Sequence, residues 1–322
     1  MSNHYHVAIV QDAPITLDIS GGIEQAAKLC KEAFEQGAQL IAFGETFLGG
    51  YPIWLDEAGG AALWDHPGTR AMHKLMLQHA IQENDERLQL LQDLADTYKG
   101  CISIGAHERR RSSLYNNQML IRPNSAPLDH RKLVPTHGER LIWMRGDGST
   151  LGTHQEGDVN IGSLICWEHW MPMARAAMHN QGEMIHVAAW PTVRDIHAIA
   201  SRHYAFEGRC FVIAAGTVQS KTDILNGLER VGGNAAASEL IETIADGQLQ
   251  FGKSFICAPD TNILAQANGK AEIIYATCDL DMIGEGLTSL DSDGHYSRPD
   301  VFDLHIDVRA KDGVNWEDGL SK

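Results

Sequence analysis

The stretch VNIGSLICWEHWMPMARAAMHNQGEMIHVAA, residues 159–189, contains the unit from which the fold of this chain can be inferred. It opens with the apolar run 159–166, which is typical of a buried strand. Residues 172–182 have helical spacing, with a proline near the start, where its missing N–H costs little, and a glycine at the end. A second apolar run follows at 184–189. Strand, helix and strand in this order predict a layered α/β fold in which helices cover sheets.

The same alternation of strand and helix recurs along the chain. Residues 6–10 predict a strand, residues 21–37 an amphipathic helix that ends at a glycine, and residues 39–43 a second strand. Further elements are expected as a helix at 85–99, a strand at 101–105, a helix at 195–209 and strands at 210–216, 253–259 and 271–280. The segment 218–250 has no clear pattern, and we expect a long surface loop with a short helix there.

The chain is expected to form one domain followed by an arm. Its length of 322 residues alone would suggest about two domains. No Pro/Ser-rich linker separates two halves, however, and no period of 20–50 residues repeats. We therefore predict a single domain over 1–287. The polar residues 288–322 are expected to be a C-terminal arm that packs on the body or on a neighbouring subunit, and its last dozen residues are expected to be loose.

The composition disfavours several kinds of partner. The chain has 42 acidic and 26 basic residues and a net charge of −16, whereas binding to nucleic acid or to anionic membranes requires a basic surface. No window approaches the roughly 18 apolar residues that span a bilayer. The first residues lack the pattern of a signal peptide. Six cysteines without a CxxC pair predict reduced thiols, and hence a cytoplasmic protein.

Cys166 ends an apolar strand and is followed at once by two tryptophans, a glutamate and a histidine. Three more reactive residues follow other predicted strands, namely Glu45, Lys132 and, seven residues later, Glu139. Loops beyond strand ends gather functional residues in layered α/β proteins. A thiol, an ammonium and carboxylates are the groups needed for covalent catalysis on an electrophilic carbon, with the thiolate attacking and a carboxylate moving protons.

Other interpretations of these residues stay open on pattern alone. Cys166 could be a buried core thiol, Glu45 a turn residue or helix cap, and Lys132 and Glu139 part of a solvated charged face. Cys166 and His169 have metal-ligand spacing, but no CxxC, HxH or HExxH supplies a second ligand pair, which disfavours a metal site. No Walker A, GxGxxG or GxSxG pattern indicates a cofactor or a serine nucleophile.

Several longer motifs along the chain carry a family resemblance. The motifs are AFGETFLGGYP (42–52), YNNQMLIRP (115–123), HRKLVPTHGERLIW (130–143), GDG (146–148), GSLICWEHWMP (162–172), HVAAWP (186–191) and GHYSRPDVF (294–302). In this order, and with a reactive residue in the expected motif, they resemble the nitrilase superfamily and specifically its true nitrilase branch. The resemblance covers nearly the whole chain.

The resemblance implies an α/β fold of four layers, an α-β-β-α sandwich, whose subunits pair and often build larger spiral oligomers. It implies Cys166 as the nucleophile, Glu45 as the general base and Lys132 as the group that stabilises negative charge. Glu139 would position the lysine and the substrate, and the backbone N–H of Trp167 would be an additional donor.

The activity implied is hydrolysis of an organic nitrile to a carboxylic acid and ammonia, with no metal or cofactor. Cyanide dihydratase or hydratase activity, aliphatic amidase activity and a non-catalytic filament-forming scaffold are the alternatives. Met144 and Lys253 stand where many relatives carry glycine, so substrate preference cannot be copied from them. An aromatic pocket is expected to bind the nitrile, and its residues are Tyr51, Trp54, His137, Trp143, Trp167 and Trp190.

Overall fold

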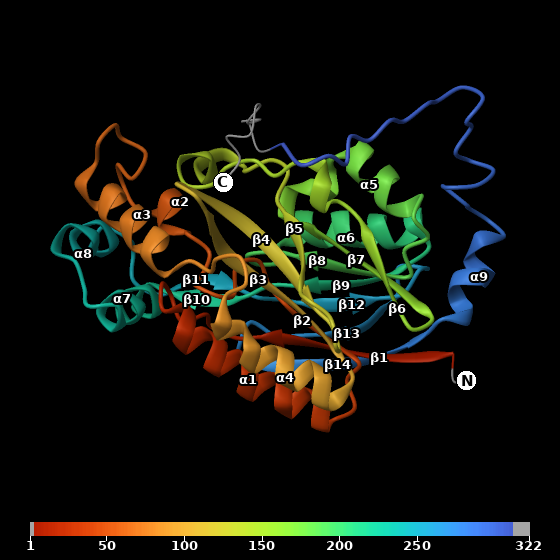
Figure 1. Ribbon diagram of the computed structural model, residues 1–322, viewed down its shortest axis with the longest axis horizontal. Helices are drawn as coiled ribbons and strands as arrows, with labels where there is room; N and C mark the ends of the chain where they lie inside the picture. The colour runs from red at the N-terminus through yellow and green to blue at the C-terminus, as the bar shows by residue number, and fades with distance from the viewer. Residues whose placement is uncertain (1–2, 312–322) are drawn as a thin grey trace, which may run out of the picture.

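Two six-stranded sheets lie face to face at the centre of the structure, which is a computed structural model that describes residues 3–311 (Figure 1). The first sheet has the order β14 (Glu272–Asp279), β1 (His4–Gln11), β2 (Leu40–Phe43), β3 (Cys101–Arg110), β4 (Ser113–Ile121), β5 (Leu128–Arg131). The second has the order β13 (Ile263–Gln266), β12 (Phe255–Cys257), β9 (Phe211–Ala215), β8 (Ile185–Ala189), β7 (Val159–Ile165), β6 (Thr153–Glu156).

Both sheets mix parallel and antiparallel pairs. β2 pairs in parallel with β1 and β3, β8 pairs in parallel with β7 and β9, and the outer strands are antiparallel. Every residue of β2, β8 and β9 is buried. These strands are covered on both faces, and they therefore appear in the sequence as continuous apolar runs rather than as alternating patterns.

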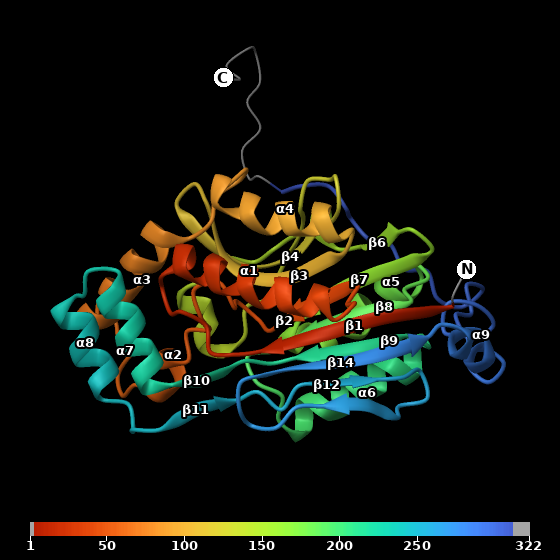
Figure 2. The ribbon, with the colours of Figure 1, turned by 90° about the horizontal axis from the view of Figure 1, so that it is seen from below.

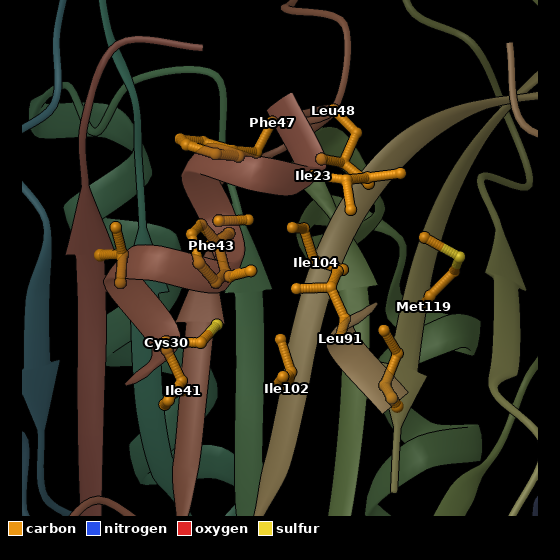
Figure 3. Close-up of a cluster of buried hydrophobic side chains, with 14 of the residues drawn as sticks. Ile23, Cys30, Ile41, Phe43, Phe47, Leu48, Leu91, Ile102, Ile104 and Met119 are labelled. Carbon is orange, nitrogen blue, oxygen red and sulfur yellow. The ribbon is translucent and has the colours of Figure 1, made fainter. Parts of the chain in front are cut away.

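Helices cover the outer face of each sheet, which gives four layers (Figure 2). On the first sheet lie α1 (Ile19–Glu35) and α4 (Gln89–Tyr98), the latter preceded by the short 3₁₀ helix η1 (Glu86–Leu88). Figure 3 shows Ile23 and Cys30 of α1 packed with Leu91 of α4 over Phe43 and Ile104 of the sheet. On the second sheet lie α5 (Pro172–His179) and α6 (Asp195–Gly208). The predicted fold class, an α-β-β-α sandwich, is confirmed.

One end of the molecule is formed by elements that were not predicted. These are α2 (Trp54–Glu57), α3 (Pro67–His79), β10 (Val218–Ser220), α7 (Lys221–Arg230), α8 (Ala235–Glu242) and β11 (Gln248–Phe251), with β10 and β11 forming a two-stranded ribbon. The expectation of a long surface loop with one short helix over 218–250 is therefore wrong, because two helices and two strands occupy most of this segment. Its two short helices bury Ile224 and Leu240 in a core that also contains Met72 of α3 and Leu114 of β4.

The chain ends in a largely exposed segment. After α9 (Asp281–Leu287), residues 288–311 run back across the body, where the Ser292 hydroxyl donates to the carbonyl of Glu207 at 2.8 Å and the Lys311 N–H donates to Asp147 at 2.6 Å. The division into a domain and an arm stays a prediction, and nearly all of the dozen residues expected to be loose lie outside the described part. Among residues 3–311, no helix has the length and apolar character needed to cross a membrane.

Candidate active site

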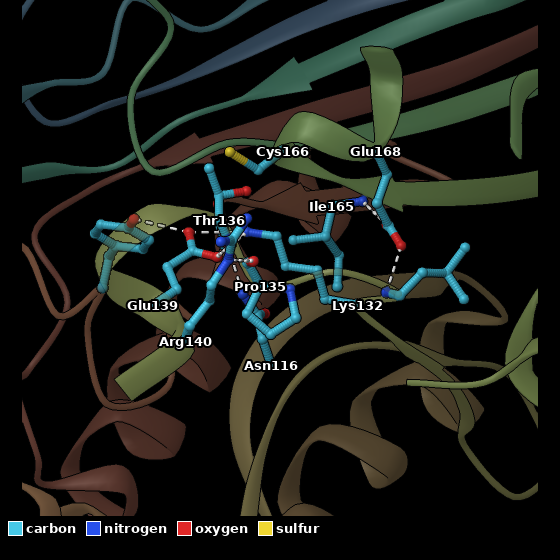
Figure 4. Close-up of polar contacts among 12 residues, drawn as sticks. Asn116, Lys132, Pro135, Thr136, Glu139, Arg140, Ile165, Cys166 and Glu168 are labelled. Atoms are coloured by element: carbon cyan, nitrogen blue, oxygen red, sulfur yellow. Dashed lines mark hydrogen bonds and ion pairs between the residues drawn. The ribbon is translucent and has the colours of Figure 1, made fainter. Parts of the chain in front are cut away.

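Four residues singled out in the sequence come together in the structure, and Figure 4 labels three of them, Lys132, Glu139 and Cys166. Glu45 follows β2, Lys132 follows β5, Cys166 follows β7, and Glu139 lies in the 3₁₀ helix η2 (His137–Leu141). The Cys166 sulfur and one carboxylate oxygen each of Glu45 and Glu139 all lie within 4.8 Å of one another. The Lys132 ammonium donates to Glu45 Oε1 at 2.8 Å and to Glu139 Oε2 at 2.7 Å. All four side chains are buried.

Backbone hydrogen bonds between distant segments fix the loops that carry these side chains. The Glu45 N–H donates to the Trp190 carbonyl at 3.0 Å, and the Lys132 N–H donates to the Asn116 carbonyl at 2.9 Å. Glu139 closes a capping box with Thr136, whose N–H donates to Glu139 Oε2 at 2.7 Å. The Tyr51 hydroxyl donates to the other oxygen of Glu139 at 2.8 Å. Rigid supports of this kind hold reactive groups in one geometry.

Cys166 itself lies on a strained turn. Its φ is +53°, a left-handed conformation that costs a non-glycine residue energy and that persists only where the surroundings enforce it. Glu168, two residues on in the 3₁₀ helix η4 (Cys166–Trp170), supplies part of that enforcement. Its carboxylate accepts from the N–H groups of Ile165 (2.6 Å) and Leu133 (2.7 Å) and from His130 Nε2 (2.8 Å). Glu168 therefore joins the Cys166 turn to the segment that carries Lys132.

A second polar chain lies behind the turn. His169 Nδ1 is 2.7 Å from the Cys166 carbonyl, and its Nε2 is 2.9 Å from His186 Nε2. His186 Nδ1 is in turn 2.6 Å from Glu183 Oε1, and the Tyr204 hydroxyl donates to Glu183 Oε2 at 2.6 Å. All four side chains are buried.

The direction of the hydrogen bonds in this chain follows from its two ends. A carbonyl only accepts, so the proton of His169 is on Nδ1, and its Nε2 accepts from His186. Burial lowers the pKa of both histidines and raises the pKa of Glu183 to about 7 against smaller opposing effects of Tyr204 and His179. A protonated Glu183 can donate to His186 Nδ1, so no group in the chain needs a charge. Tyr204 then donates to Glu183, Glu183 to His186, His186 to His169, and His169 to the Cys166 carbonyl.

The electrostatics of Glu45 suit a general base. Burial and the charge of Glu139 raise its pKa, whereas Lys132 and the Asn116 amide, which donates to Oε1 at 2.6 Å, lower it, and the result is a pKa of about 7. Both of these donors use Oε1. Glu45 Oε2 is buried and has no hydrogen-bond partner within residues 3–311. This free oxygen is available to accept a proton.

Cys166 and Lys132 have complementary shifts. Burial and the two neighbouring carboxylates raise the pKa of the Cys166 thiol well above its usual value, against a smaller lowering by Lys132 and by the Trp167 N–H. Burial opposes a charge on Lys132, but Glu45, Cys166 and Glu139 together raise its pKa. At rest the site therefore holds a thiol and an ammonium, and the sulfur must lose its proton during attack rather than before it.

A cavity of about 450 Å³ opens above Cys166. Three of the six predicted pocket residues, Tyr51, His137 and Trp167, line it. Trp54, Trp143 and Trp190 do not. Trp54 and Trp190 are core residues, and Trp143 packs beside Lys132 with its ring centre 5.8 Å from Nζ. The expected aromatic lining is therefore only partly present, because half of these rings fill the interior.

Other residues of the site were not singled out in the sequence. Further lining comes from the region of α2, from the segment after β8 and from β11, and it includes Ile53, Asp56, Pro191, Arg194 and Phe251. Asn116 lies in one of the family motifs, and only that motif could have indicated its role. The loop residues have no local signal, because they meet through tertiary contacts.

The cluster of Glu45, Glu139 and Cys166 also has the spacing of a metal site. The Lys132 ammonium, however, already donates to both carboxylates. A second cation among the same oxygens would meet a buried positive charge at close range, which is unfavourable at low dielectric. The donor set fits an ammonium better than a metal ion.

Comparisons with known proteins agree with this geometry. A sequence model of the family described as carbon-nitrogen hydrolase matches residues 6–286. The chain is 34% identical to an aliphatic nitrilase of Sinorhizobium fredii, over 96% of this chain and 98% of that one. It is 30% identical to an arylacetonitrilase of Macrophomina phaseolina, over 98% and 94%. A crystal structure of a carbon-nitrogen hydrolase from Helicobacter pylori superimposes with a TM-score of 0.68 at 18% identity, covering 92% of this chain and 98% of that one.

Proposed function

The chain belongs to the carbon-nitrogen hydrolase family, the nitrilase superfamily, and from this premise we propose that it is a nitrilase. Its reaction would convert an organic nitrile and two waters into a carboxylic acid and ammonia. One observation carries the proposal. Cys166 lines a cavity, its sulfur lies within 4.8 Å of a carboxylate oxygen of Glu45, and the Lys132 ammonium donates to that carboxylate.

The first half of the proposed reaction forms a covalent thioimidate. Cys166 Sγ bonds to the nitrile carbon while Glu45 takes the thiol proton. One π pair of the C≡N bond moves to nitrogen, which then receives that proton. The charge that develops on nitrogen is met by the Lys132 ammonium and the Trp167 backbone N–H, which are fixed before the reaction begins.

The second half releases both products. Water activated by Glu45 adds to the thioimidate carbon, the C–N bond breaks with proton transfer to nitrogen, and ammonia leaves a thioester on Cys166. A second water adds, the C–S bond breaks, and the carboxylic acid leaves as the thiol recovers its proton. If the first tetrahedral intermediate breaks its C–S bond instead, the product is an amide, so we expect a minor amide by-product.

The relatives support this branch of the family without fixing the substrate. The names of the compared enzymes include both an aliphatic nitrilase and an arylacetonitrilase. Turnover of cyanide or of amides by the same site is the second candidate, since the same thiol and base serve all three reactions. A non-catalytic scaffold is disfavoured. Burying a lysine and two carboxylates carries a desolvation cost, and a protein without catalytic activity would have no reason to keep such a cluster.

Ammonia release from purified protein tests the proposal. The panel contains aliphatic and arylacetic nitriles, cyanide and the amides that match each nitrile, and Cys166→Ala serves as the blank. We expect acid and ammonia from nitriles and much slower release from amides. Turnover of amides with none of the nitriles would assign the protein to an amidase activity instead.

Two further properties stay predictions from the sequence. A cytoplasmic location and self-association into a dimer and a larger spiral oligomer are part of the proposal. Light scattering of the purified protein at several concentrations would test the second.

A further inference from the structure

Two cations lie on one wall of the cavity above Cys166. Arg194 and Lys253 both line this cavity and are exposed, and neither forms an ion pair with a carboxylate among residues 3–311. The lining between them is partly apolar, with Val193 and Phe251. A guanidinium and an ammonium without anionic partners, placed together in a cavity, form a binding site for an anion.

The backbone holds the segments that carry Arg194 and Lys253 next to each other. The Val193 N–H donates to the Gly252 carbonyl at 2.7 Å, and Arg194 and Lys253 are the residues that directly follow these two partners. The Phe251 N–H also donates to Thr192 Oγ1, at 3.1 Å. Lys253 has a φ of +56°, so a long charged side chain is kept in a left-handed conformation.

The negative charges near the cavity lie elsewhere. Of the carboxylates that line the cavity, Asp56 and Glu57 lie in α2 and Glu139 lies in η2, where it is bonded to Lys132. Asp195 follows Arg194 but lines a separate hollow with Ile199. The side of Arg194 and Lys253 is therefore the positive side of the cavity. The N-terminus of α6, which begins just after Arg194, adds a partial positive charge there.

Resting on the proposed nitrilase function, we propose that the substrate is a nitrile that carries a carboxylate at its other end, which Arg194 and Lys253 bind while Cys166 attacks the nitrile carbon. The overall reaction is ⁻OOC–R–C≡N + 2 H₂O → ⁻OOC–R–COO⁻ + NH₄⁺. The dicarboxylate product keeps the anion that binds Arg194 and Lys253, so it should compete with the substrate.

The test compares ω-cyanocarboxylates of increasing chain length with their methyl esters and with ω-amino nitriles of the same length. The wild-type protein should have a kcat/KM at least about tenfold higher for the best cyanocarboxylate than for its ester. Arg194→Gln with Lys253→Gln should lower this ratio about tenfold or more, mainly through KM. Arg202→Gln removes the same charge from the hollow on the other side of α6 and should leave the ratio unchanged.

The outcomes separate this inference from the function on which it rests. Turnover of neutral or ammonium-bearing nitriles in preference to cyanocarboxylates, or a ratio that the double variant does not change, would overturn the carboxylate site and leave the nitrilase function standing. If no nitrile is hydrolysed, calorimetry still decides. Cys166→Ala should bind the dicarboxylates at least about tenfold more tightly than the same protein with Arg194→Gln and Lys253→Gln added, and equal affinity would contradict the proposal.

Discussion

Two buried polar clusters adjoin Cys166, the front one at its sulfur and the rear one at its carbonyl, and they differ in charge. In front, Lys132 bonds to Glu45 and Glu139, and the cluster is ionised. Behind, the chain from Tyr204 through Glu183, His186 and His169 ends on the Cys166 carbonyl. That chain is neutral while Glu183 keeps its proton.

The difference teaches what each cluster is for. An ionised cluster with one free carboxylate oxygen can move a proton and meet developing charge. A neutral chain with each internal hydrogen bond made can hold a strained turn but has no free group to offer the substrate. We therefore assign catalysis to the front cluster and positioning of the nucleophile to the rear one.

The largest expected effect comes from the residue between the clusters. Cys166→Ala should lower turnover by on the order of 10⁴-fold or more, because no other group can form the covalent intermediate. The fold should remain, since the change only shortens a small side chain. Cys210→Ala, at another buried cysteine, is the control and should keep its activity. Equal loss in both variants would point to damaged packing.

The same substitution made in each cluster compares them directly. Glu45→Gln should lower kcat about 10³-fold, because an amide cannot act as a base. Glu183→Gln should lower it by no more than about threefold, since the amide can still donate to His186 and accept from Tyr204. Steady-state kinetics of the two variants check this. A loss in Glu183→Gln as large as in Glu45→Gln would mean that the rear cluster also acts through a charge.

The pH profile sharpens the role of the front cluster. Glu45 must be ionised to act as a base, and its pKa is raised to about 7, so kcat/KM should fall as the pH drops below about 7. Asn116→Ala removes a hydrogen bond that lowers this pKa, and the acid limb should move to higher pH by roughly half a unit to one unit. Asn117→Ala, on the opposite face of β4, should leave it in place. The same limb in all three proteins would refute the assignment of Glu45.

The smallest expected effect is on stability. Burial raises the pKa of Glu183 above its unfolded value, so its contribution to stability is complete below about pH 4.5 and is lost as the pH rises through about 7. Glu183→Gln does not titrate. The melting temperature of the wild-type protein should therefore fall relative to that of Glu183→Gln between pH 5 and pH 8. Parallel curves would indicate that Glu183 does not change its protonation there.

Much of the fold could be predicted because most central strands are buried on both faces. Such strands appear in the sequence as apolar runs, as β2 and β8 do, and a helical pattern between two such runs completes a recognisable strand–helix–strand unit. The helices α3, α7 and α8 were missed. They pack on one another at one end of the molecule and do not alternate with buried apolar strands, whereas α4 and α5, which are equally short, do alternate with such strands.

The site divides in the same way. Each residue of the front cluster follows a strand or lies in a motif, and the sequence indicated all four. The rear chain and the cationic wall were not predicted as parts of the site, although His169 and Lys253 were noted in the sequence. They depend on contacts such as that of Val193 with Gly252, which join segments far apart in the chain. The sequence also does not indicate whether an aromatic side chain in or near a motif points into the cavity or into the core. Trp54 and Trp190, which are core residues, show this.

Peptide mass spectrometry after rapid quench of a slow nitrile tests the central claim most directly. If the front cluster performs the chemistry on Cys166, the acyl or imidoyl adduct should appear on the peptide that contains Cys166, and its amount should rise and decay at the rates of turnover. Glu45→Gln should form this adduct much more slowly. An adduct on any of the other five cysteines, or turnover without any adduct in a quench fast enough to capture it, would contradict the account.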